Sequence, residues 1–226
     1  MIASWRSVFQ VPDAFFGIIQ LSTWAPQGNF SGIFMGQQLA QLRVDQLTGL
    51  THPADAYASN ADHGAGVNIH PPYKQYPGRR LAAAALNIVY GEGNAWRHPT
   101  YASAAVAGVA SATITLTDVA AAGLSLLSVP FNEVPGGATP SFCAQQNAAN
   151  PHTCAGAAVK FDDGTWADAA VSLTADAQRL VLTPVAPAPA GATAIVATAY
   201  GWGSIPLMTA YRADIDAPVL GWNKTV

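Results

Sequence analysis

The sequence contains few charged residues. Only 10% of its 226 residues are Asp, Glu, Lys or Arg, whereas an average globular domain has about 25%. Half of the residues are hydrophobic, which excludes intrinsic disorder, because disordered chains combine low hydrophobicity with high net charge. Ten Lys and Arg accompany thirteen Asp and Glu without a cluster of either sign. This balance excludes the basic surface of a nucleic-acid-binding protein.

Long, strongly apolar runs are also missing. One long uncharged stretch, residues 98–117, consists mainly of Ala, Ser, Thr, Gly and Val. It predicts soluble strands, since a membrane-spanning helix needs about 20 predominantly apolar residues. The opening MIASWRSVF contains Arg6 and no long apolar segment, so it does not resemble a signal peptide. Two N-x-S/T triplets, at Asn29 and Asn223, favour a secreted or lysosomal protein.

Cysteine is scarce. Cys143 and Cys154 have ten residues between them, in a segment with the composition of a loop. They form either a local disulfide or two free thiols. His152 is the one histidine nearby, and the spacing does not match a zinc site.

Up to about residue 95 the pattern combines helices with a strand. The continuous apolar run 15–21 predicts a strand buried on both faces, as in a parallel sheet. Residues 51–72 show little periodicity and predict a loop of a length that is uncommon unless it has a function. Helices are predicted over residues 2–9, 37–50 and 73–90, the last of them ended by Gly91.

The composition changes after Trp96 to runs of Thr, Val, Ala and Leu divided by Gly and Pro. Asp162-Asp163-Gly164 predicts a hairpin turn, with calcium binding as the alternative role of the two aspartates. The expected fold is an α/β domain over residues 1–95 followed by an all-β sandwich over residues 96–226. Alternation with period two predicts strands over residues 112–117, 177–183 and 194–200.

The predicted long loop carries three of the five histidines, His52, His63 and His70. Loops of this kind, placed by a rigid sheet, commonly hold catalytic residues. A metal site would combine His63 and His70 with Asp55 or Asp62. Their spacing matches no standard metal-binding signature, so no metal is predicted.

The segment that begins at Asn68 resembles a catalytic block of a known family. Residues 68–75 read N-I-H-P-P-Y-K-Q and residues 78–82 read G-R-R-L-A. This is similar to the D-I-H-P-x-x-K-Q and G-R-R-L-A block of the sialate O-acetylesterases, which are SGNH-type carbohydrate esterases. Shorter pieces also resemble the family: residues 2–6 match I-x-x-W-R, residues 16–21 match F-x-x-V-Q-L, and residues 42–46 match L-R-x-x-Q.

The resemblance implies a fold and an activity. The α/β part would be a portion of the SGNH three-layer fold, carrying the histidine loop, with the β-sandwich after it. The activity implied is hydrolysis of O-acetyl esters of sialic acid or related sugars by a Ser-His mechanism without a cofactor. An alternative substrate is an acetylated plant or microbial polysaccharide, because the fold alone does not settle the substrate.

The resemblance also implies roles for individual residues. In that family the His of I-H-P is the general base for a serine nucleophile, so this role falls to His70. The acidic position before it is occupied by Asn68, which leaves Asp62 or a backbone carbonyl to orient His70, if anything does. Asp62 is otherwise interpreted as a turn residue.

Two further residues are candidates for binding the sugar. Trp24 follows the predicted strand 15–21, and it either lines a sugar pocket or packs in the core. Arg79 either binds a sugar carboxylate or forms a structural salt bridge. Adjacent residues on a helix point in different directions, so at most one of Arg79 and Arg80 faces a site.

The nucleophile of the family has no counterpart in the sequence. Neither its G-Q-S-N block nor a G-x-S-x-G elbow occurs, and Ser4, Ser22 and Ser59 lack matching neighbours. The sequence therefore predicts the C-terminal part of an esterase, with an N-terminal partner segment supplying the serine and pairing with the strand 15–21. Three origins of such a chain are open. The gene model begins at an internal Met, the chain is a processed subunit, or it is a noncatalytic module that binds carbohydrate or another partner.

Overall fold

The structure is a computed structural model, and it describes residues 1–24, 37–65, 68, 70–128 and 156–226. Both cysteines and the triplet at Asn29 lie outside these ranges. The helices described are α1 (Ile2–Val8), α2 (Gln37–Thr48) and α3 (Gln75–Tyr90). The strands described are β1 (Phe16–Ile19), β2 (Asp55–Ala58), β3 (Thr100–Ala107), β4 (Ser111–Thr117), β5 (Leu124–Leu126), β6 (Ala157–Phe161), β7 (Trp166–Leu173), β8 (Arg179–Pro184), β9 (Ile195–Tyr200), β10 (Ala210–Arg212) and β11 (Trp222–Thr225).

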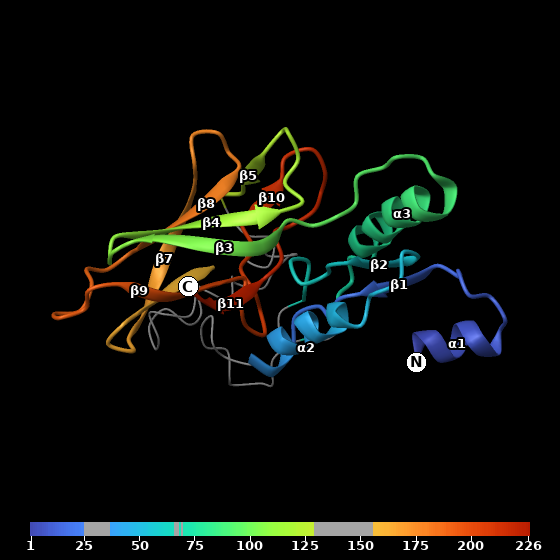
Figure 1. Ribbon diagram of the computed structural model, residues 1–226, viewed down its shortest axis with the longest axis horizontal. Helices are drawn as coiled ribbons and strands as arrows, with labels where there is room; N and C mark the ends of the chain where they lie inside the picture. The colour runs from blue at the N-terminus through green and yellow to red at the C-terminus, as the bar shows by residue number, and fades with distance from the viewer. Residues whose placement is uncertain (25–36, 66–67, 69, 129–155) are drawn as a thin grey trace.

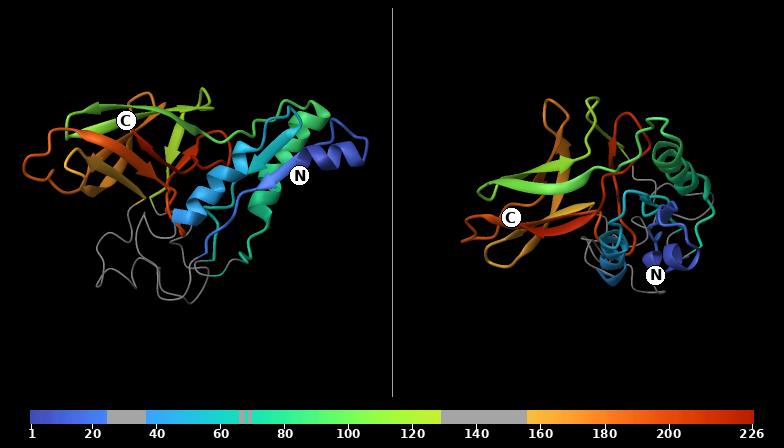
Figure 2. Two further views of the ribbon diagram at one scale, coloured as in Figure 1. Left: turned by 60° about the horizontal axis from the view of Figure 1, so that its bottom comes forward. Right: turned by 45° about the vertical axis from the view of Figure 1, so that its right-hand side comes forward.

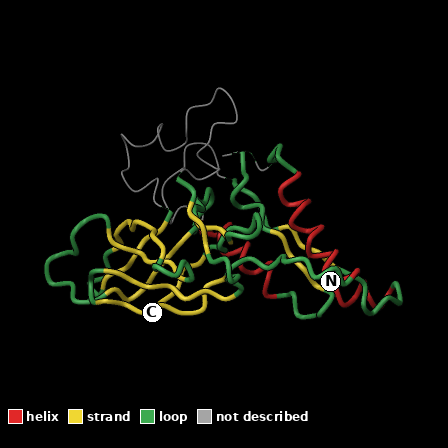
Figure 3. The backbone as a smooth tube through the Cα atoms, turned by 90° about the horizontal axis from the view of Figure 1, so that it is seen from above, coloured by secondary structure: helices red, strands yellow, loops and turns green. Residues whose placement is uncertain are grey.

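The helices gather at one end of the molecule and the antiparallel strands at the other (Figures 1, 2 and 3). The change takes place between the end of α3 at Tyr90 and the start of β3 at Thr100. The division into two domains at residue 95 stays a prediction. In the described part of the chain, no helix is long and apolar enough to cross a membrane.

The helical end is built on two parallel strands. β1 pairs with β2 in register from Phe16 opposite Asp55 to Ile19 opposite Ala58. Helix α3 covers one face so closely that Gly17 lies against Leu81, with no room for a side chain. The helices predicted from the sequence are confirmed, and α3 ends at Gly91 with a positive φ of 69°, a conformation that glycine adopts at little cost.

Two expectations for this end were wrong. β1 is not buried on both faces, because Ile19 is 43% exposed and β2 is the strand's described neighbour. The predicted loop over residues 51–72 contains strand β2. Its sequence, Asp-Ala-Tyr-Ala, has no β-branched residue, and Tyr57 alone is of a type enriched in strands, so the local strand signal is weak. The three-layer SGNH fold stays a prediction.

The strands at the other end confirm the prediction that the second part of the chain is all-β. Seven antiparallel strands form one continuous sheet in the order β11-β9-β6-β7-β8-β4-β3, and β10 pairs with β5 separately. The two edge strands of the large sheet come together, since the rings of Tyr101 on β3 and Trp222 on β11 lie 5.4 Å apart. The sheet thus curls over one core, and its two halves face each other as the layers of a sandwich do. The alternate side chains Ala112, Ile114 and Leu116 point into this core, as predicted.

The hairpin predicted at Asp162-Asp163-Gly164 is confirmed between β6 and β7, and Gly164 has a φ of +91°. Asp163 accepts hydrogen bonds from the backbone and the hydroxyl of Thr165. Asp162 accepts hydrogen bonds from Thr193 on the neighbouring loop. Both carboxylates therefore stabilise turns in this structure.

Candidate active site

Polar residues follow both parallel strands at the same edge of the small sheet. Residues 21–24 follow β1 and residues 59–64 follow β2, and ligands of open α/β sheets bind beyond this carboxyl edge. Thr23 lies directly against Gly64, which joins the two segments. Ser22, Thr23 and Asn60 are buried, and one side-chain oxygen of each has no partner among the described residues. Buried polar atoms are normally paired, so these three oxygens make this edge a candidate functional site.

His70 lies in the loop that leads from this edge into α3. Its side chain is exposed, and its backbone N–H donates to Oδ1 of Asn68 at 2.9 Å. The same oxygen lies 3.3 Å from Nδ1 of the imidazole. An amide oxygen only accepts hydrogen bonds, so this contact favours the tautomer with a proton on Nδ1. Nε2 then keeps the lone pair that a general base needs.

Asn68 is thus the residue that the structure places beside His70. In the sequence alone this position lacks the expected carboxylate, and no role is predicted for Asn68. The signal was its spacing, two residues before the histidine, where the family resemblance expects an acid. An amide in that position can hold the imidazole in one tautomer, although it cannot balance the charge of an imidazolium.

The carboxylate of Asp62 is bound by three buried side chains other than His70. Its two carboxylate oxygens accept a bidentate pair of 2.7 Å hydrogen bonds from Arg80 of α3, and the hydroxyl of Tyr211 donates to it at 2.7 Å. Nδ1 of His63 lies 2.9 Å from the same carboxylate. Burial alone would raise the pKa of Asp62, but the hydrogen bonds from His63 and Arg80 outweigh it and hold this pKa well below its usual range. Asp62 therefore remains a carboxylate at the centre of a buried network.

This network ties three parts of the chain together. Arg80 also donates to the carbonyl oxygen of Ser59 at 2.8 Å and to the carbonyl oxygen of Asp216 at 2.7 Å. Burial and the adjacent Asp62 carboxylate raise the pKa of Tyr211, so its hydroxyl stays a donor. The end of β2, the start of α3 and the C-terminal segment are thereby locked around one carboxylate. The predicted role of Asp62 in orienting His70 stays a prediction.

The two adjacent arginines both approach the carboxylate of Asp216, but they differ in burial. The side chain of Arg80 is buried, whereas that of Arg79 is 67% exposed and reaches Asp216 only at 3.9 Å. Arg79 also lies over the ring of Tyr76, 5.1 Å from its centroid. Its guanidinium is therefore open to a ligand carboxylate, which leaves its predicted binding role untested.

Trp24 lies where the sequence placed it, directly after the edge of β1. It is 43% exposed, and its backbone N–H donates to the carbonyl oxygen of Ser204 at 3.3 Å. Packing in a core does not account for that exposure, and its sugar-binding role stays a prediction. Of the serines considered, Ser4 is exposed on α1, while Ser22 and Ser59 are buried.

Helix α2 holds the segment that follows β1 in place through the side chain of Arg43. The guanidinium of Arg43 donates to the carbonyl oxygens of Leu21 and Ser22, and across the molecule to those of Gly203 and Ser204, at 2.7–3.1 Å. Burial lowers the pKa of Arg43 to about 9, so it stays charged at neutral pH.

Gln46 of the same helix accepts from the backbone N–H of Leu21 at 3.0 Å and donates to the carbonyl oxygen of Ile19 at 3.3 Å. Its amide therefore pairs with the outer edge of β1 as a neighbouring strand would. The L-R-x-x-Q motif of the sequence thus has a structural role, which is to position the segment that carries Ser22 and Trp24.

The proposed metal ligands do not assemble into a site. In the residues that the structure covers, no group of three or more His, Cys, Asp and Glu side chains is placed to hold a metal ion. Asp55 pairs with Arg6 at 2.7 Å, and Asp62 pairs with Arg80. These carboxylates are therefore neutralised by arginines.

Comparison with known proteins identifies similarity at the level of the fold. No family model and no curated protein matches the chain. Its fold is similar to the crystal structure of XAC1771, a carbohydrate acetylesterase from Xanthomonas citri, with a TM-score of 0.71 and 23% sequence identity. The match covers 99% of this chain and 44% of that protein. The chain therefore has the fold of part of a carbohydrate acetylesterase and spans less than half of its length.

Proposed function

We propose that this chain is the C-terminal part of a carbohydrate O-acetylesterase, with His70 as the general base. The observation that carries the proposal is the likeness of nearly the whole chain to part of a carbohydrate acetylesterase. The His70–Asn68 contact adds chemical support, because it leaves Nε2 as the acceptor. The substrate proposed is an O-acetyl ester of sialic acid or a related sugar, with an acetylated polysaccharide as the alternative.

The reaction follows the chemistry of acyl transfer. A serine hydroxyl attacks the acetyl carbonyl carbon while Nε2 of His70 takes its proton, and the imidazolium then protonates the departing sugar oxygen. Water next attacks the acetyl-serine with His70 again as base, and acetate leaves. We propose that the serine comes from a segment outside these 226 residues. Arg79 and Trp24 would hold the sugar, and Asn68 would hold the imidazole in its reactive tautomer.

The test is acetate release by the polypeptide encoded by the complete reading frame that contains this sequence, compared with the chain alone. The substrates are 9-O-acetylated N-acetylneuraminic acid and acetylated xylo-oligosaccharides, which separate the two substrate classes. We expect release by the complete polypeptide and a loss on the order of 10³-fold or more in His70→Ala. The control is His52→Ala, because His52 is remote from the His70 loop and contacts Asp13.

The outcomes separate the parts of the proposal. Release that persists in His70→Ala, or no release from any acetylated sugar, would contradict the esterase. Release by the chain alone that His70→Ala abolishes would keep the esterase and place the nucleophile within this chain.

A noncatalytic carbohydrate-binding or interaction module is the second candidate. It is favoured by Asn68, an amide in the position where the resemblance expects a carboxylate. Binding of a glycan without acetate release by the complete polypeptide would support this function.

A secreted or lysosomal location is proposed on the triplet at Asn223, which lies on β11.

A further inference from the structure

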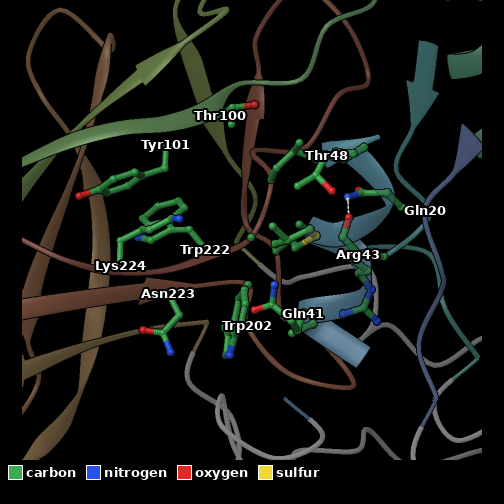
Figure 4. Close-up of a pocket in the computed structure, with 18 residues that line it drawn as sticks. Gln20, Gln41, Arg43, Thr48, Thr100, Tyr101, Trp202, Trp222, Asn223 and Lys224 are labelled. Atoms are coloured by element: carbon green, nitrogen blue, oxygen red, sulfur yellow. Dashed lines mark hydrogen bonds between the residues drawn. The ribbon is translucent and has the colours of Figure 1, made fainter. Parts of the chain in front are cut away.

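A separate cavity lies between helix α2 and the curled sheet (Figure 4). Its volume is about 400 Å³, within the range of sites that bind small molecules. One wall comes from β3, β11 and the segment after β9, and the other from α2. The cavity is therefore formed by the packing of the helical end against the β end.

The sheet wall carries aromatic rings that are fixed in place. Trp222 stacks on Tyr200 with ring centroids 5.0 Å apart, and its indole N–H donates to the hydroxyl of Thr198 at 3.1 Å. Tyr101 packs beside it from β3. Trp222 is only 2% exposed, so the partly exposed ring of Tyr101, which Trp222 supports, is the aromatic surface that this wall offers to a ligand.

Trp202 adds an unusual feature to this wall. It is only 7% exposed, and its indole N–H has no acceptor among the residues that the structure describes. A buried donor without an acceptor destabilises the protein by about 1–3 kcal/mol. The nitrogen is not accessible from the cavity, so Trp202 contributes the side of its ring to this wall.

Polar side chains complete the lining. Gln41 of α2 lies beside Trp202 in Figure 4, and its Nε2 donates to Asp45 at 2.8 Å, which leaves its carbonyl oxygen as an acceptor. Asn223 and Lys224 line the cavity from β11. The described lining residues include two cations, Arg43 and Lys224, and no carboxylate. The cavity therefore suits a neutral or acidic ligand with many hydroxyl groups.

We infer that this cavity is a binding site for one sugar unit of a glycan, with the ring of Tyr101 against the sugar ring and Gln41 and Lys224 on its hydroxyl or carboxylate groups. The choice of a sugar rests partly on the proposed function, but the binding itself requires neither His70 nor a serine. The site would hold a part of the glycan that does not react. Remote binding of this kind increases the efficiency of an enzyme on long substrates.

The test is saturation-transfer NMR with two probes, neutral xylohexaose and acidic 3′-sialyllactose, each at about 5 mM so that a millimolar Kd is detected. The variants are Gln41→Ala and Lys224→Ala. Matched controls are Gln38→Ala on the same helix and Lys74→Ala, because both residues are exposed and neither belongs to the described lining. Thermal melts check that every variant is folded.

We expect at least one probe to bind, with its affinity reduced about fivefold or more in Gln41→Ala and unchanged in Gln38→Ala. A loss in Lys224→Ala that is confined to 3′-sialyllactose would identify an acidic sugar as the ligand. Binding that remains in His70→Ala separates this site from ester hydrolysis. Absence of binding by both probes, or equal binding by Gln41→Ala and Gln38→Ala, would overturn the inference.

Discussion

His98 makes the stability of this protein sensitive to mild acid. The side chain is fully buried, with Nδ1 3.0 Å from the carbonyl oxygen of Pro218 and Nε2 3.4 Å from the backbone nitrogen of Ser59. The carbonyl requires a proton on Nδ1, and the backbone N–H requires a lone pair on Nε2. The folded protein therefore contains the neutral imidazole, which connects the end of β2 to the C-terminal segment.

The size of the effect follows from the pKa of His98. Burial, with a further contribution from the positive charge of Arg80, lowers this pKa from 6.5 to about 4. Such a difference corresponds to about 3 kcal/mol. The unfolded chain binds a proton below its pKa of about 6.5, whereas the folded protein resists protonation until about pH 4. The contribution is therefore complete above pH 6.5 and is lost as the pH falls towards 4. Asp62 keeps its charge throughout this window, because its pKa is held below its usual range.

The assay is urea unfolding, followed by tryptophan fluorescence, at several pH values between about 7.5 and 4. His98→Gln lacks the titrating group, so it is expected to be less stable at neutral pH but to lose less stability on acidification. The difference in free energy of unfolding between the natural protein and this variant should narrow by about 3 kcal/mol across the window. His52→Gln, at a partly exposed histidine, serves as the control. A constant difference across the window for His98→Gln would refute the reasoning.

Three further predictions concern the site and its support. Asp62→Asn should reduce the free energy of unfolding by about 3 kcal/mol or more, because it leaves the buried guanidinium of Arg80 without its main counter-charge; a loss below about 1 kcal/mol in urea unfolding would show that the pair contributes little. Gly64→Ala should destabilise by about 1–3 kcal/mol, since the added methyl group overlaps Thr23. Thr23→Gly in the same chain should recover part of that loss, and failure of the rescue would argue against the overlap. Asn68→Asp should increase kcat/KM for acetate release at neutral pH about tenfold or more, because a carboxylate stabilises an imidazolium and an amide does not. Equal activity of Asn68→Asp and the natural protein would mean that this position does not orient the base.

The tertiary structure also explains which features of the candidate site could be predicted from the sequence and which could not. The sequence identified the loop with His70 and placed Trp24 after a strand, because both depend on residues close together in the chain. It did not identify the contacts of Asp62. Tyr211, which donates to this carboxylate, is 149 positions away in the chain. No periodic pattern records a contact over such a distance, because its partners are selected by packing.

The sequence by itself determined the local elements of the fold. Alternation at Ala112, Ile114 and Leu116 specified a strand with one buried face, and Gly91 specified the end of α3 through its positive φ. The turn at Asp162-Asp163-Gly164 likewise depended only on neighbouring residues.

Only the tertiary structure decided how these elements combine. Strand β2 lacks β-branched residues and exists because its backbone pairs with β1 and packs under α3. The seven strands of the large sheet curl over one core, and its edge strands β3 and β11 meet through Tyr101 and Trp222. The backbone pairing and burial that stabilise these arrangements join residues far apart in the chain, so they arise only when the whole chain folds.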